Sequence, residues 1–233
     1  MIIMPSNSSG WIWHCLARET GCLGHLHSPG QQRGPWPWFP FALDNGAYSC
    51  WDQSTNKFDA EKWERTEREW HRLLVWATCQ VQKPMWAIVP DRPGSGFVTL
   101  EKWRVYAPVV QEHGIPLAVA VQDGMMPRDV KHLDPHPEVV CVGGSTKWKW
   151  DTIEQWAASF PRVHLLRCNA PGKLDYLEEL GVESTDGTGW NRGDRTQTSG
   201  IERWCRKRTN PVTHHELWPY GSRPVEKGQI TFA

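Results

Sequence analysis

The sequence predicts an α/β protein that folds as one small, partly irregular (β/α)8 barrel. Short apolar segments alternate with helix-like segments at least six times, which is typical of a parallel sheet with helices outside it. The chain has 233 residues, near the lower end of the range for such a barrel, so we expect a single domain. We expect a core over residues 38–190, a long covering loop over 6–37, and a C-terminal helix and tail over 201–233.

The predicted strands are apolar runs that end at proline, glycine or polar residues. They cover residues 1–5, 39–43, 85–89, 116–121, 139–142 and 163–167, and a last strand ends at Asp186. An irregular eighth unit completes the predicted barrel. Between residues 6 and 37 the chain is rich in Gly, Pro, Ser and His and carries Trp11, Trp13 and Trp36. So long a loop in a compact domain is usually a functional cover.

Helices are predicted where apolar residues recur at helical spacing. Asp59 can cap one helix, and Thr99 begins the next, which Pro108 is expected to kink or shorten. Asp151 and Glu154 have the capping-box pattern of a later helix. Shorter helices are expected over 127–132 and over 174–180, and a last one follows residue 201.

Composition limits the classes of function. With 26 basic and 26 acidic residues the net charge is zero, so a nucleic-acid partner would need a local basic face. One candidate for such a face is the cluster of Arg203, Arg206, Lys207 and Arg208. These residues could contact phosphates, or they could form the solvated end of a helix. The 16 tryptophans are compatible with stacking on bases or sugars, or with filling the layer between helices and sheet.

Cysteine and hydropathy patterns favour a reduced, cytoplasmic protein. The seven cysteines form no C-x-x-C pair, which argues against a disulfide framework and against a structural zinc site. No stretch approaches the ~20 apolar residues of a membrane span, so no membrane association is expected. Histidines are missing from the predicted strand ends, so we expect no metal and no cofactor.

Polar residues and glycines follow the predicted strands at the point where each strand ends. They are Asp44, Asp91, Gln122, Gly143, Gly144 and Asp186. Because active sites of parallel barrels lie at the carboxyl ends of the strands, we expect these residues to meet there. Asp186 is followed by Gly187 and Gly189, which let a ligand approach closely.

Four of these strand ends resemble motifs of the queuine/archaeosine tRNA-guanine transglycosylase superfamily, including its shorter phage and bacterial relatives that act on DNA. Residues 43–48, Leu-Asp-Asn-Gly-Ala-Tyr, look like its Asp-Ser-Gly-Gly-Phe motif, and residues 120–124 look like its Val-Gln-Gly-Gly. Residues 142–144 look like its Gly-Gly-Leu. Residues 166–186 are similar to its strand, turn, helix and Gly-(Ile/Val)-Asp-x-x-Asp ending. The motifs occur in family order over roughly residues 38–190.

The resemblance implies a role for each matched residue. Asp186 would be the nucleophile at the anomeric carbon of a sugar, and Asp44 would handle the proton of the departing base. Asp91 and Gln122 would read the polar edge of the base, while Gly143 and Gly144 would offer backbone amides. Cleavage of an N-glycosidic bond builds positive charge on the sugar and negative charge on the base, so two carboxyl groups in different surroundings suit it.

The chain also departs from the family pattern. Ala47 and Tyr48 replace the second glycine and the Phe of the first motif, and Lys147 follows the altered Gly-Gly segment. We include Tyr48 and Lys147 as candidate substrate contacts. Residues 190–233 hold too few Cys and His residues for the zinc site of the tRNA enzymes, which makes tRNA the less favoured substrate.

Several functions remain open from the sequence. The first is a DNA glycosylase that flips out a modified base, releases it and leaves an abasic site, which would suit defence against viruses with hypermodified DNA. The second is a transglycosylase that exchanges the base, with a deazaguanine-type base on DNA or with guanine on tRNA. A barrel that only binds nucleic acid and a metal hydrolase are alternatives of other classes. Trp11, Trp13 and Trp36 are candidates to hold a flipped base.

Overall fold

A computed structural model describes residues 1–5, 10–187, 189–191 and 195–208. Its main sheet has eight parallel strands in the order β1-β10-β9-β8-β7-β6-β3-β2. Ile3 N donates to Cys22 O (2.8 Å) and Gly24 N donates to Ile3 O (2.9 Å), so the two edge strands also meet. The barrel strands are β1 (Ile2–Pro5), β2 (His25–His27), β3 (Phe41–Leu43), β6 (Ala87–Ile88), β7 (Leu117–Val121), β8 (Val139–Val142), β9 (Val163–Leu165) and β10 (Ser184–Gly187).

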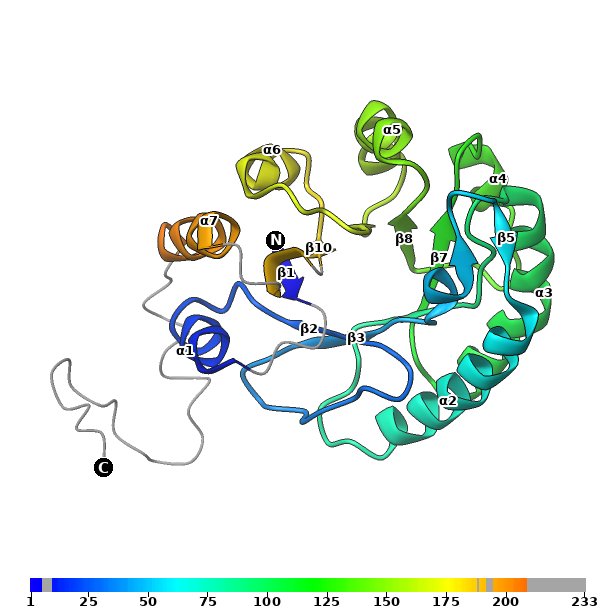
Figure 1. The fold of residues 1–233 in the computed structure, drawn as a ribbon, viewed down its shortest axis with the longest axis horizontal. Helices are drawn as coiled ribbons and strands as arrows, with labels where there is room; N and C mark the ends of the chain where they lie inside the picture. Colours follow the sequence, from blue (N-terminus) through cyan, green and yellow to red (C-terminus); the bar gives the residue numbers. More distant parts are fainter. Residues whose placement is uncertain (6–9, 188, 192–194, 209–233) are drawn as a thin grey trace, which may run out of the picture.

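The α-helices lie around the outside of this sheet (Figure 1). They are α1 (Trp11–Thr20), α2 (Ala60–Thr78), α3 (Gly96–Glu112), α4 (Pro127–Lys131), α5 (Thr146–Ser159), α6 (Leu174–Glu179) and α7 (Arg195–Arg206). A two-stranded antiparallel hairpin, β4 (Trp51–Asp52) with β5 (Lys57–Phe58), follows β3. The predicted (β/α)8 barrel is therefore confirmed.

Two apolar layers hold the barrel together. The outer layer lies between helices and sheet and buries six indoles, those of Trp13, Trp70, Trp103, Trp156, Trp190 and Trp204. The inner layer fills the barrel with small and medium side chains around Trp86. Of the two explanations for the many tryptophans, core filling accounts for these seven. Their burial contributes roughly 2–3 kcal/mol each relative to exposure, on the scale of other large apolar side chains.

The prediction of one long covering loop over residues 6–37 is wrong. Helix α1 and strand β2 lie within this range and form the first βα unit and the second strand of the barrel. α1 buries Trp13, Leu16, Ala17 and Thr20, and Gly21 ends it in the left-handed conformation (φ 64°). The segment reads as a loop because β2 has only three residues, two of them histidines, in a stretch rich in Gly, Pro and Ser.

The irregular unit of the barrel is the second one, not the eighth. No helix joins β2 to β3, and in Figure 1 the wall between α1 and α2 contains only irregular chain. The aromatic rings of this segment cover the outer face of β2. Phe39 stacks on His25 at 4.3 Å between centroids, and Trp36 packs edge-on against the same ring at 5.4 Å. These aromatic side chains take the place of the missing helix.

Helix ends agree with the sequence predictions at one position and differ at two. The Asp59 side chain caps α2 by accepting from Lys62 N, as predicted. α3 begins at Gly96 with Ser95 as its cap and runs through Pro108 to Glu112, so Thr99 does not begin it and Pro108 does not shorten it. α5 begins at Thr146 with Ser145 as its cap, which places Asp151 inside the helix and not at its start.

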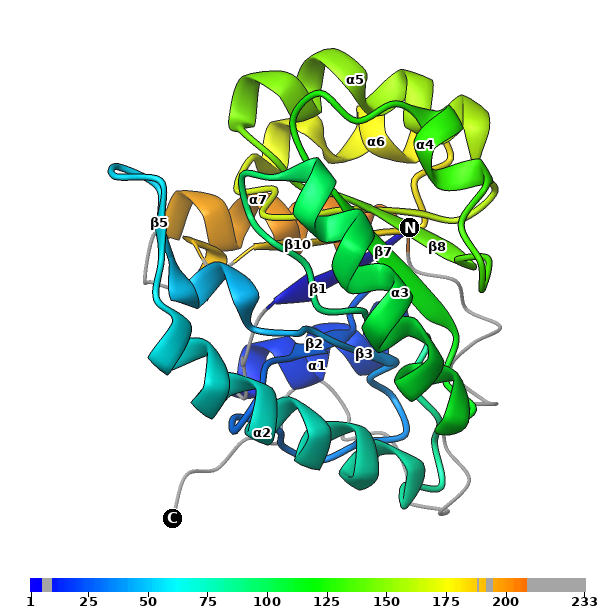
Figure 2. The same cartoon turned by 90° about the vertical axis from the view of Figure 1, so that its right-hand side faces the viewer.

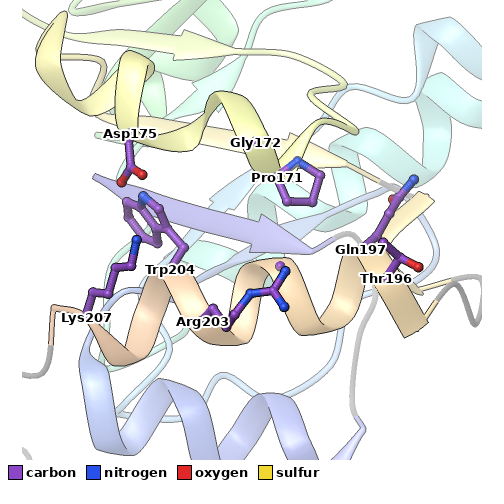
Figure 3. A pocket seen from close by; sticks show the side chains of 9 residues that line it. Pro171, Gly172, Asp175, Thr196, Gln197, Arg203, Trp204 and Lys207 are labelled. Carbon is purple, nitrogen blue, oxygen red and sulfur yellow. The ribbon is translucent and has the colours of Figure 1, made fainter.

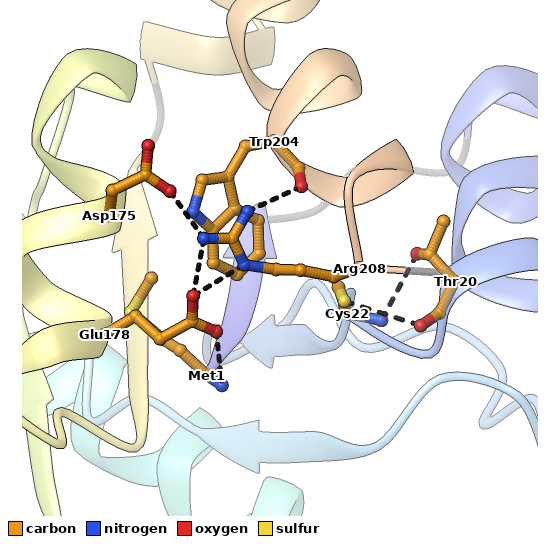
Figure 4. Close-up of polar contacts among 7 residues, drawn as sticks. All are labelled: Met1, Thr20, Cys22, Asp175, Glu178, Trp204 and Arg208. Atoms are coloured by element: carbon orange, nitrogen blue, oxygen red, sulfur yellow. Dashed lines mark hydrogen bonds and ion pairs between the residues drawn. The ribbon is translucent and has the colours of Figure 1, made fainter. Parts of the chain in front are cut away.

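Helix α7 packs between α1 and α6 on the outside of the barrel (Figure 1). A groove of about 320 Å³ separates α7 from the segment 171–175, and Arg203 and Lys207 line it together with Trp204 (Figure 3). Arg208 lies just beyond α7 and pairs with Asp175 and Glu178, while Glu178 also faces the amino terminus at 3.6 Å (Figure 4).

The four cations of the predicted basic cluster thus fall into two groups. Arg206 pairs with Glu19 and Glu202, and Arg208 pairs with acidic residues of α6, so both fasten α7 to its neighbours. Arg203 and Lys207 are exposed on the groove. The expected tail over 209–233, with His214 and His215, lies outside the described residues. Among the residues that the structure describes, no helix is both long and apolar enough to cross a bilayer.

Candidate active site

A cavity of about 370 Å³ opens at the carboxyl ends of the barrel strands. All but one of the predicted site residues line it: Asp44, Tyr48, Asp91, Gln122, Gly143, Gly144 and Asp186. They come from the ends of β3, β7, β8 and β10 and from the loops that follow β3 and β6. The volume is within the range of sites for small molecules and single nucleotides.

Lys147 is the exception. Its ammonium group pairs with Asp151 one turn further along α5, and its side chain is largely exposed. Because α5 begins at Thr146 and not near Asp151, Lys147 belongs to the first turn of the helix and does not line the cavity. The sequence-based assignment of Lys147 as a substrate contact is therefore corrected.

Asp186 is anchored through one of its two carboxylate oxygens. Asp186 is only 4% exposed. Its Oδ1 accepts a hydrogen bond from the backbone N–H of Arg167 (2.7 Å) and lies 3.3 Å from Nε2 of His164. Within the described part of the chain, Oδ2 accepts no hydrogen bond, although the residue lines the cavity. A carboxylate held in this way has one oxygen fixed and the other available to a ligand.

His164 links Asp186 to the inside of the barrel. Its ring is fully buried, Nδ1 lies 2.8 Å from Oγ of Ser184, and the ring packs edge-on against Trp86 at 4.8 Å. In a neutral imidazole, a Ser184 hydroxyl that donates to Nδ1 leaves the proton on Nε2, which then donates to Asp186. His164 and Ser184 are register partners on the adjacent strands β9 and β10.

Asp44 has different surroundings. It is half-buried, and Ser28 Oγ donates to its Oδ2 at 3.3 Å. Burial raises the pKa of Asp44 above its ordinary value, and the nearby negative charge of Asp186 raises it further. Asp44 therefore keeps its proton to higher pH than a solvated aspartic acid. Both carboxyl groups face one cavity, and they differ in burial and in hydrogen-bond partners.

Asp91 is buried in a network of amide side chains. Oδ1 accepts from Asn45 Nδ2 (2.9 Å) and Oδ2 accepts from Gln122 Nε2 (2.6 Å). Gln122 Oε1 in turn accepts from Gly94 N at 3.2 Å, so the orientation of its amide is fixed. Burial raises the pKa of Asp91 to about 6, with a smaller contribution from the charge of Asp44. This network presents a fixed pattern of donors and acceptors on one wall.

Gly144 adopts a backbone conformation that a side chain would not permit. Its φ is 69°, and a Cβ atom built on it would lie 2.1 Å from Oδ1 of Asp123. Asp123 Oδ1 also accepts from Ser145 N at 2.6 Å. The Gly143–Gly144 turn therefore needs glycine for its left-handed residue and lets the chain pass from β8 into α5 beside the cavity.

Arg167 is a cavity residue that the sequence analysis does not single out. Its φ of 56° is unusual for a residue other than glycine, a strain of roughly 1–3 kcal/mol. Besides the backbone bond to Asp186, its Nη2 donates to Gly144 O (2.5 Å), and its guanidinium lies 4.1 Å from the ring centroid of Tyr48. No local pattern reveals this position, because its conformation depends on tertiary contacts.

A buried lysine supports the same segment. Lys149 on α5 is 3% exposed, and its Nζ donates to Leu166 O (2.7 Å) and Arg167 O (3.0 Å). Burial and, to a smaller extent, the nearby charge of Arg167 lower the pKa of Lys149 to about 8. The ammonium group therefore fixes the two carbonyl groups that precede the turn and supports the strained conformation of Arg167.

We expect Lys149→Met to lower the free energy of unfolding by about 1–3 kcal/mol, because two buried carbonyl groups lose their shared donor. Urea denaturation at pH 7 measures the change. Lys147→Met on the same helix is the matched control, because it removes an exposed lysine, and it should stay within about 0.5 kcal/mol of wild type. Equal effects of the two substitutions would contradict the role of Lys149.

The rim of the cavity is formed by the segment that follows β3. Trp51, Gln53 and Asn56 of the β4–β5 hairpin line it with Tyr48, which is 43% exposed. In Figure 2 this hairpin projects at the end toward which β1 points. The expectation that Trp13 and Trp36 serve the site is wrong, because both pack on the outer side of the barrel. Trp11 is 73% exposed at the start of α1 and does not line the cavity.

Fold and site together define a class: a (β/α)8 barrel with a cavity at its carboxyl end, lined by four aspartates and one arginine. In the described residues no cluster of three or more His, Cys, Asp or Glu side chains is arranged to hold a metal ion. The chain matches no protein-family model, and a search of curated proteins finds no significant match.

Proposed function

We propose that this protein cleaves the N-glycosidic bond of a modified nucleobase in DNA, releasing the base and leaving an abasic site. The observation that carries the proposal is the pair Asp186 and Asp44. They share one cavity, yet Asp186 presents an oxygen that accepts no hydrogen bond from the described residues, while the pKa of Asp44 is raised. Glycosidic cleavage needs these two roles, an ionised carboxylate at the sugar and an acid at the leaving base.

In this proposal Asp186 acts beneath the anomeric carbon. Oδ1 is held by the N–H of Arg167 and by His164, so Oδ2 is free to attack the carbon or to stabilise its positive charge. His164 and Ser184 hold the carboxylate in position from inside the barrel. Water or a second base then releases the sugar from Asp186. Water gives a glycosylase, and a second base gives a transglycosylase.

Asp44 donates its proton to the base as the bond breaks, and the Asp91 network reads the edge of the base. With Asp91 ionised, the acceptors on this wall face N–H groups of a base, and Gln122 Nε2 offers a donor beside them. The cavity of about 370 Å³ is larger than a plain base requires, which favours a base with a substituent. Such a base must leave the duplex first, and Tyr48 and Trp51 at the rim are placed to stack on it.

The experiment that tests the proposal uses plain DNA, DNA with hypermodified viral bases, and tRNA. The released small molecules are analysed by mass spectrometry, and the nucleic acid is tested for alkali-labile sites. Free base with abasic sites supports the glycosylase, and incorporation of a labelled base indicates exchange on DNA or tRNA. Binding without either product would favour a barrel that only binds nucleic acid and would refute the proposal.

The rate of base release should depend on pH in a bell shape. Asp91, whose pKa is raised to about 6, gains a proton as the pH falls and loses acceptor capacity, which produces the acid limb. Activity also falls as pH rises through the raised pKa of Asp44, because the acid is then ionised. Rates under single-turnover conditions from pH 4 to pH 9 measure both limbs. Asp91→Asn should remove the acid limb, and an unchanged limb in this variant would contradict the assignment.

A further inference from the structure

The cavity that holds the aspartates has a cation at its rim whose hydrogen-bonding capacity is mostly unused. Among the described residues that line it, Arg167 is the only lysine, arginine or histidine, against Asp44, Asp91, Asp123 and Asp186. A guanidinium group has five N–H donors, of which one is given to Gly144 O. In the described part of the chain no carboxylate pairs with Arg167. A buried or half-buried arginine in so acidic a cavity would ordinarily pair with one of these carboxylates.

Instead, the guanidinium is held away from them by three contacts. The Gly144 carbonyl accepts from Nη2, the Tyr48 ring lies 4.1 Å from the guanidinium carbon, and the backbone is held by Asp186 and Lys149. Tyr48 is among the exposed residues of the rim, so the cation lies where the cavity meets solvent. The left-handed conformation of Arg167 is maintained by these contacts and directs the side chain across the rim.

A second feature adds positive potential at the same place. α5 begins at Thr146, two residues after the Gly144 carbonyl that holds the guanidinium, so the positive end of its helix dipole lies beside Arg167. The N-terminus of a helix and the guanidinium group of arginine both bind phosphate oxygens well. Asp123 Oδ1 accepts from Ser145 N at this helix start, so the guanidinium of Arg167 supplies the positive charge that a phosphate meets there.

We propose that Arg167 and the start of α5 form a phosphate subsite, which binds a phosphodiester next to the nucleotide whose base occupies the cavity. This inference rests on the proposed function for the identity of the ligand. The backbone N–H of Arg167 holds Asp186, and its guanidinium holds the phosphate. Arg167 thus fixes the distance between the phosphate that is joined to the sugar and the Asp186 carboxylate. The subsite recognises the backbone, and the Asp91 network recognises the base.

The first test measures binding of the four ordinary deoxynucleosides and their 5′- and 3′-monophosphates by calorimetry. Wild type should bind at least one monophosphate about tenfold or more tightly than its nucleoside, the effect of a charge-assisted hydrogen bond. Arg167→Met should reduce this preference to less than about twofold. Arg128→Met removes a cation whose side chain is 82% exposed outside the cavity and is the matched control, which should keep the preference.

The second test changes the DNA and leaves the protein intact. A neutral methylphosphonate replaces one phosphate next to the target nucleotide, first on one side and then on the other. At one of the two positions the change should lower kcat/KM of wild type about tenfold, and Arg167→Met should be insensitive to it. Equal monophosphate and nucleoside affinities in wild type, or a preference that survives Arg167→Met, overturns the subsite. If base release is still observed in that case, only the phosphate subsite is refuted and the glycosylase proposal remains. If a phosphate preference is observed without base release, only the proposed function is refuted.

Discussion

Asp186→Asn is expected to reduce base release by at least about 10³-fold, because a neutral amide neither attacks the anomeric carbon nor stabilises its charge. The substitution keeps the size of the side chain and leaves an oxygen to accept the N–H of Arg167. We therefore expect the fold to persist. Single-turnover rates of base release measure the effect, and urea denaturation checks the fold.

The matched control for Asp186→Asn is Asp151→Asn. Asp151 is exposed on α5, pairs with Lys147 and lies outside the cavity, so its loss should leave base release within about twofold of wild type. Activity of folded Asp186→Asn within tenfold of wild type would remove Asp186 from the chemistry. Loss of activity in both variants would indicate a general effect of charge.

Asp44→Asn is expected to reduce base release by about 10²–10⁴-fold, the usual contribution of a general acid. Its defect should depend on the leaving base. A base whose departing nitrogen has a low pKa needs little protonation, so the variant should lose less activity on it than on a base with a high pKa. Rates on a series of modified bases in the same DNA sequence measure this dependence.

This pattern separates an acid from a residue that only binds. Loss of a binding contact lowers the rates on all bases by a similar factor, whereas loss of the acid makes the rate more sensitive to the pKa of the leaving base. Asp91→Asn is the comparison, because Asp91 lines the same cavity and is assigned to the base edge. A uniform defect of Asp44→Asn across the series would contradict its role as the acid.

The sequence predicts several strands closely. β8 lies at 139–142 as expected, and β7 and β9 begin within one residue of their predicted starts. The prediction fails for β2 because its three residues include His25 and His27, whose burial depends on Trp36 and Phe39 packing over them. Local polarity predicts a loop there, whereas tertiary aromatic packing forms a strand.

In the candidate site, too, some residues could be predicted from the sequence and others could not. Aspartates at strand ends are visible in the sequence, because the carboxyl ends of parallel strands share one edge. His164 could have been found from the inward alternation of its strand, which it shares with Ser184 and Asp186 across the register. Arg167 and Lys149 could not, since their roles depend on a left-handed residue and on a contact between α5 and the end of β9.

The central claim is that this cavity breaks an N-glycosidic bond through Asp186. The most direct measurement counts released bases and abasic sites in the same reaction on base-modified viral DNA, with wild type and with folded Asp186→Asn. We expect the two products in a one-to-one ratio from wild type and neither from the variant. Absence of both products from wild type on every modified DNA, or equal yields from the two proteins, would contradict the claim.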